Sequence, residues 1–170
     1  MIDRRRLIRF VVAAGPLLAA GLLSSASLAQ QSFQRFFPLL VELPGWKGGK
    51  SDGAAVEIPG ASMLTATREY RRGEARLDAQ VIIGAAAQGA LAAIQPGVKF
   101  ETSEGRMSTT TVDGLQIMRT FNISDKSGAV VVALGPSAMF NLAFNGVDED
   151  EALELARKFN WKGMQAALPK

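Results

Sequence analysis

Two adjacent segments, Met63–Tyr70 and Ala75–Ile83, alternate hydrophobic and polar residues around a turn centred on Arg72-Gly73. Successive side chains of a strand point to opposite faces, so this pattern predicts a β-hairpin with one apolar and one polar face. One pairing around the turn satisfies both faces. It places the following residues opposite each other: Leu64 and Val81, Ala66 and Ala79, Arg68 and Leu77, Tyr70 and Ala75, Glu69 and Arg76, Thr67 and Asp78, Thr65 and Gln80.

A run of small apolar residues, 84–94, follows this hairpin and ends at Gln95-Pro96-Gly97. Ala and Gly allow two backbones to approach closely, so we expect a thin helix packed against the sheet. The spacings Ala85/Gly89 and Ala86/Ala90 are those of a membrane dimerisation motif. Eleven residues are too few to cross a bilayer, which needs about 20.

Turn residues then divide the chain into further short apolar segments. Asp113-Gly114 is typical of a type I′ hairpin turn, and residues 125–128 and 135–137 are two more turns. Consecutive hairpins predict an antiparallel meander. Its strands are Arg106–Val112, Leu115–Ile123, Ala129–Leu134 and Ala138–Val147, and Val98–Thr102 adds another if it is extended.

The end of the chain has helical periodicity. Asp148 is a candidate N-cap, and the acidic residues up to Glu151 favour the positive end of a helix. Asn160 is a candidate cap for a last short turn. The apolar residues recur at the spacing of one helix face: Ala152, Leu155, Ala156, Phe159.

Together these segments give the order ββαββββα. We therefore expect an α+β domain at 58–170, a single antiparallel sheet of about six strands covered on one face by two helices. Residues 30–57 form a lead-in with short helices, in which Pro38 suits a first turn, and a Gly-rich loop. The topology over Ile58–Leu168 resembles Mog1/PsbP-type folds, a resemblance without a diagnostic motif that implies no function.

The first 29 residues have the three parts of a signal peptide: a basic head, an apolar run at 10–23 and a tail of small residues. The tail predicts cleavage after Ala29. The head also resembles a twin-arginine signal, carried by Arg4, Arg5, Leu7 and Ile8. A general secretory signal, whose head needs only positive charge, is the alternative. Either route predicts a bacterial protein of the periplasm or the cell exterior.

The net charge of the chain comes from its first 29 residues. The chain of 170 residues carries a net charge of +3. Residues 1–29 contain four of the 19 basic residues and one of the 16 acidic ones, so the remainder carries 15 of each. The mature chain is therefore predicted to be neutral, which supports neither nucleic-acid nor membrane binding. We also expect no integral membrane segment in it.

Several kinds of chemistry are excluded by the residues present. The chain has no Cys and no His, which removes thiol nucleophiles, the commonest metal ligand and the usual proton shuttle. It also has no phosphate loop, dinucleotide fingerprint or G-x-S-x-G elbow. We therefore predict no cofactor, no metal site and no catalytic residue. These absences do not exclude an enzyme that uses carboxylates or hydroxyls without a metal.

Three residues are candidates for ligand binding: Arg68, Arg119 and Tyr70. Both arginines lie on predicted core-facing sides of their strands, where a guanidinium is costly unless it is paired. Its planar fork suits a carboxylate or phosphate, and Tyr70 offers a hydroxyl. The alternative is structural, because each arginine can reach water at a strand end or pair with Glu or Asp.

These observations lead to a hypothesis of an exported, non-enzymatic binding or accessory protein with an unknown protein partner. The chain resembles many small bacterial exported proteins of unknown function, a likeness that implies no activity. A carrier of a small anionic or amphipathic ligand is the first alternative. A metal-independent enzyme is the second.

Overall fold

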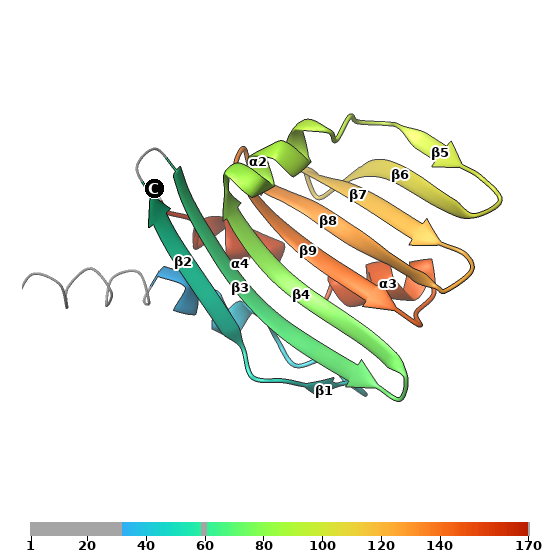
Figure 1. Ribbon diagram of the computed structural model, residues 1–170, viewed down its shortest axis with the longest axis horizontal. Helices are drawn as coiled ribbons and strands as arrows, with labels where there is room; N and C mark the ends of the chain where they lie inside the picture. The colour runs from blue at the N-terminus through green and yellow to red at the C-terminus, as the bar shows by residue number, and fades with distance from the viewer. Residues whose placement is uncertain (1–31, 59–60, 170) are drawn as a thin grey trace, which may run out of the picture.

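The computed structural model of the chain describes residues 32–58 and 61–169. Within them, one antiparallel sheet of nine strands forms the centre of the molecule (Figure 1). The strands are β1 (Lys47–Gly48), β2 (Asp52–Ile58), β3 (Ala61–Arg72), β4 (Ala75–Gly84), β5 (Lys99–Glu101), β6 (Gly105–Val112), β7 (Leu115–Asn122), β8 (Ser127–Gly135) and β9 (Ala138–Asn145). The helices are the 3-10 helix η1 (Phe37–Leu39) and the α-helices α2 (Ala85–Ala92), α3 (Glu149–Ala156) and α4 (Trp161–Ala166), and residues 32–34 at the start of the described chain are also helical.

The strands lie in the order β1-β3-β4-β9-β8-β7-β6-β5, and β2 pairs with β3 on the same edge as β1. The α+β class and the antiparallel sheet are therefore as the sequence predicted. The strand count is larger than six because residues 47–58, expected to be a loop, contribute β1 and β2. Residues 99–101 add β5 at the opposite edge.

The first hairpin forms with a register two residues away from the predicted one. Ala66 pairs with Val81 and Arg68 with Ala79, because the turn is the two-residue loop Gly73-Glu74. A shift by an even number preserves the face of every side chain, so the apolar face is the expected one. The cross-strand ion pair is lost, since Glu69 faces Asp78 and not Arg76.

The second hairpin has the predicted turn. Asp113 and Gly114 both have positive φ, +52° and +82°, which is the requirement of a type I′ turn. Val112 and Leu115 are the last pair before this turn.

One face of the sheet, here called the covered face, packs against the lead-in, α3 and α4. The core between these layers includes the largest buried side chains, with Tyr70, Leu77, Ile117 and Phe140 from the sheet and Phe36 and Leu40 from the lead-in. Phe159, just after α3, lies 4.8 Å from the ring of Phe140 and 6.1 Å from that of Tyr70. Asn160 caps α4 by accepting a hydrogen bond from the Gly163 N–H at 2.8 Å. Asp148 takes the N-cap position of α3, but its side chain makes no capping bond and pairs with Lys126 at 3.0 Å.

Helix α2 packs on the other face, here called the open face, so the two predicted helices do not cover the same side (Figure 1). Ala87 and Ile94 contact Val131 and Met139 in a small second cluster. Gly84 directs the chain there, since its φ of +114° and the adjacent Ser62 carbonyl leave no room for a side chain.

Candidate functional site

Arg68 and Tyr70 hold the lead-in against the covered face. The Arg68 guanidinium donates to the carbonyls of Leu40 at 2.7 Å and Gly49 at 2.9 Å, and it pairs with Glu42. It also lies 5.3 Å from the centre of the Tyr70 ring. These donors are engaged by the chain itself, so Arg68 acts as a clamp between β3 and the lead-in.

Tyr70 completes this clamp. Its side chain is fully buried, and its hydroxyl donates to the Val41 carbonyl at 2.7 Å. Burial raises the pKa of Tyr70 to about 12, against the lowering effect of the neighbouring Arg68 charge. The phenol is therefore neutral at physiological pH and serves as a hydrogen-bond donor.

Arg119 lies in a different part of the covered face. Glu149, the first residue of α3, is 3.7 Å from Arg119 and 3.3 Å from Arg106. The Arg119 Nε is buried without a hydrogen-bond partner among the described residues. Three strands separate β3 from β7, about 19 Å at the usual strand spacing. The structure thus brings Arg68 and Tyr70 together and leaves Arg119 apart, so the three do not line one pocket.

A surface cavity of about 370 Å³ opens at the end of the sheet where β5–β8 meet. Phe100, which is 61% exposed, and Met107 form its apolar wall. Two of its polar acceptors are already engaged: the Thr120 hydroxyl accepts from the Ala129 N–H at 3.1 Å, and the Asn122 carbonyl oxygen accepts from the Ser124 N–H at 3.0 Å. The wall formed by Phe100 and Met107 offers apolar contact.

The most unusual surface of the molecule lies at the other end of the open face. Its helical part consists of exposed residues of α2, and all but one are Ala or Gly: Ala85, Ala86, Gln88, Gly89, Ala90, Ala92. Most exposed helices carry charged or polar residues on their outer side, whereas residues 84–98 contain no charge. This helix is therefore apolar both toward the sheet and toward solvent.

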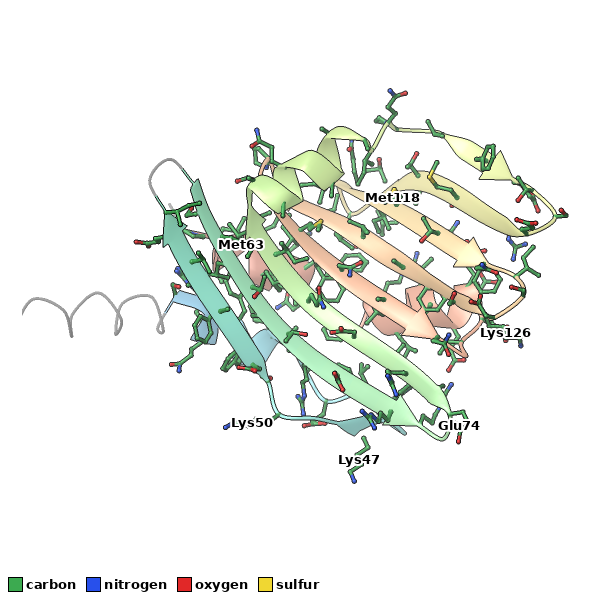
Figure 2. The ribbon with its side chains drawn as sticks, in the orientation of Figure 1. Lys47, Lys50, Met63, Glu74, Met118 and Lys126 are labelled. Carbon is green, nitrogen blue, oxygen red and sulfur yellow. The ribbon has the colours of Figure 1, made fainter. Side chains whose placement is uncertain are left out.

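Exposed side chains of the β2–β3 hairpin continue this apolar surface. Val56, Ile58 and Met63 are 45%, 60% and 42% exposed. Val56 pairs with Met63, and Met63 pairs with Gly84 at the start of α2, so the residues are neighbours. Figure 2 shows Met63 on the same face as Met118, which packs in the α2 cluster. We call the three side chains together with the outer side of α2 the helix–hairpin surface.

Sequence reasoning did not single out this surface. Residues 52–58 were expected to be a loop, and 84–94 a helix hidden by close packing. The charge-free run at 84–98 was the available signal, because a helix that is apolar on all sides is typical of a buried or interacting helix.

Two further features concern metals and membranes. Within 32–58 and 61–169, no three acidic residues gather in a way that would hold a metal ion. None of the helices in these ranges has the length and hydrophobicity needed to cross a bilayer. The predicted signal residues Arg4, Arg5, Leu7 and Ile8 and the cleavage position Ala29 lie outside the described residues.

Comparison with known proteins gives no relative. No family model matches the chain, and no curated protein and no solved structure is significantly similar to it.

Proposed function

We propose that this chain is an exported, non-enzymatic protein of the bacterial periplasm or cell exterior that binds a partner protein through the helix–hairpin surface. One observation carries the proposal: helix α2 exposes Ala and Gly where surface helices carry charge. Exposed apolar surface that adjoins exposed Val56, Ile58 and Met63 is typical of an interaction site.

The chemistry of the surface defines the partner. Ala85/Gly89 and Ala86/Ala90 are one helical turn apart and exposed, so the outer side of α2 is shallow. Larger side chains of another helix fit such a surface, because small residues let helices approach closely. The expected partner therefore presents an uncharged, apolar helix.

Substitution of Ala86 by Glu tests this proposal. The new carboxylate stays exposed in the free protein but is desolvated in the complex, so we expect affinity for the partner to fall by about tenfold or more. Ala166→Glu on α4 is the matched control, because Ala166 is exposed on a helix that packs on the covered face. A photo-crosslinker at position 86 in producing cells identifies the partner, with position 166 as the control that is expected not to capture it, and calorimetry with the purified partner measures the affinities. Equal affinity for both variants would contradict the proposal.

Export is tested separately. Replacement of Arg4 and Arg5 by Lys preserves the charge of the head but removes the twin-arginine pair. We expect the variant to remain in the cytoplasm of a bacterial host, while the native chain reaches the periplasm and starts at Gln30. Unchanged export would assign the chain to the general secretory route.

A second candidate function is the transport of a small amphipathic ligand. The cavity beside Phe100 and Met107 supports it, because an aromatic side chain 61% exposed at a cavity wall offers apolar contact. Native mass spectrometry of protein purified from its own cells tests this role. A retained small molecule that disappears in Phe100→Ala supports it, and bare protein contradicts it.

A further inference from the structure

The two edges of the sheet differ in how they resist pairing with another strand. Strand β5 has three residues, and two of them are the charged Lys99 and Glu101. Strand β2 has seven residues without Lys or Pro, and its register with β3 is unbroken from Asp52 to Ile58. Both edge strands carry two charged residues, Asp52 and Glu57 in β2, so β2 is the less protected edge by its length and its unbroken register.

The outer side of β2 has no strand beside it in the described ranges, although the Gly53 N–H donates to the carboxylate of Asp52 at 2.8 Å. All seven residues of β2 pair with β3 on the inner side of the strand. In the described ranges, no backbone hydrogen bond joins the outer side to another segment. Figure 1 shows β2 at the margin of the sheet. The edge is about 23 Å long and can accept an added strand.

We propose that a second copy of this chain fills this edge, with the two β2 strands antiparallel across a two-fold axis at Ala55. Such an interface uses the same residues of both copies, so the sequence of β2 must be complementary to itself. The axis pairs Ala54 with Val56 of the other copy, Gly53 with Glu57, and Asp52 with Ile58. Neither carboxylate opposes another, and the small Ala55 lies on the axis.

The side chains support the same arrangement. Ala54, Val56 and Ile58 share the open face of the strand, and all three are exposed. Pairing across the axis joins these rows from both copies into one apolar stripe. The two sheets become one continuous sheet with a helix–hairpin surface on each side of the axis. The dimer goes beyond the proposed partner binding and does not require it, because it uses the backbone edge of β2 and leaves α2 free, although Val56 and Ile58 belong to both surfaces.

A charge swap at one pair of positions tests the dimer and its register. A54K/V56K places two positive charges opposite each other on both sides of the axis, and we expect dimer dissociation to increase about tenfold or more. A54K/V56E is the matched control, because it places opposite charges at the same positions and is expected to restore the dimer. Sedimentation equilibrium of the exported protein over a range of concentrations measures each dissociation constant.

A cysteine on the axis gives a second measurement that does not depend on charge. The native chain has no Cys, so Ala55→Cys introduces one thiol per copy. Residues paired directly across antiparallel strands are close enough for a disulfide. We expect rapid oxidative dimer formation at this position and none for Ala166→Cys on α4.

Three outcomes would overturn the dimer: a wild-type protein that stays monomeric at high concentration, a dimer unaffected by A54K/V56K, or no crosslink through position 55. If β2 binds a strand of another protein and not a second copy, the purified wild-type chain stays monomeric at high concentration, which is the first of these outcomes. Ala86→Glu changes only α2 and is expected to remain dimeric, so loss of partner binding with an intact dimer separates the two proposals. A54K/V56K also changes Val56 of the helix–hairpin surface, so the dimer is judged by sedimentation and by the crosslink at position 55, and not by partner binding.

Discussion

The two faces of the sheet are built differently. On the covered face, Arg68 and Tyr70 bond to carbonyls of the lead-in, and rings such as Phe140 are fully buried. On the open face a single helix covers part of the sheet, and large apolar side chains such as Phe100 and Ile58 stay in water. The comparison indicates that the covered face stabilises the fold, whereas the open face and its β2 edge carry the surfaces that we propose for binding.

The largest difference is expected when the same aromatic residue is truncated on each face. Phe140→Ala leaves a cavity beside Phe159, so we expect the free energy of unfolding to fall by about 4 kcal/mol. Phe100→Ala on the open face should change it by less than about 0.5 kcal/mol, since the side chain is mostly solvated. Equilibrium urea denaturation measures both. Similar losses would remove the distinction between the faces.

A smaller difference is expected for two arginines of β3. Arg68→Ala removes the clamp on the lead-in, so stability should fall by about 2 kcal/mol. Protease cleavage between residues 47 and 51 should also accelerate, because the lead-in loses its anchor. Arg71 is the control: its side chain is 61% exposed, and Arg71→Ala should cost less than about 0.5 kcal/mol. If both variants behaved alike, Arg68 would be free for another role.

The ionisation of Tyr70 allows its contribution to stability to be tested by varying the pH. Tyr70→Phe removes the bond to the Val41 carbonyl and should cost about 1 kcal/mol at neutral pH. The folded pKa of Tyr70 is about 12, against 10 in the unfolded chain. The contribution of the protonated Tyr70 to the free energy of unfolding is complete below pH 10, where the phenol is protonated in both states. It is lost between pH 10 and 12, where the phenol ionises only in the unfolded chain.

Wild-type protein should therefore lose more stability than Tyr70→Phe in this range of pH. Tyr70 is the only tyrosine, so ultraviolet absorbance follows its ionisation directly. Parallel pH profiles for the two proteins would show that the phenol ionises equally in both states.

The smallest effect is expected at Gly89 on the outer side of α2. An added methyl group there meets no atom within 4 Å, so Gly89→Ala should raise stability by about 0.5–1 kcal/mol through helix propensity. Gly114→Ala is the contrasting control, because φ is +82° and the same substitution should lower stability by about 1 kcal/mol. Thermal unfolding detects both signs. A loss at Gly89 would indicate that α2 is covered in the native state.

Local patterns predicted much of the sheet. Alternation placed Ala66 and Tyr70 on the same buried face, and Asp113-Gly114 gave the type I′ turn, because these features depend on neighbouring residues. The hairpin register was two residues off, since Gly73-Glu74 and not Arg72-Gly73 forms the loop. Each side chain nevertheless lies on its predicted face of the sheet, because side chains alternate with a period of two.

The candidate site was less accessible to sequence reasoning. Sequence reasoning assigns Arg68 and Arg119 to one candidate site because both face the core. The distance between them depends on the strand order, however, and three strands lie between β3 and β7. Strand β2 has little hydrophobic alternation in Gly53-Ala54-Ala55. It is extended because β3 offers it a free edge, a contact that no local pattern records.

The sequence by itself determined the antiparallel α+β class, the central hairpins and the neutral charge of residues 30–170, because strand periodicity, turn chemistry and composition are local properties. Tertiary structure alone decided that α2 lies on the open face, that the lead-in is clamped by Arg68, and that β2 is an edge. These features depend on which segments meet in space. Helix 84–94 is apolar on every side, so its sequence fits either face, and only the packing of Ala87 and Ile94 against Val131 and Met139 selects one.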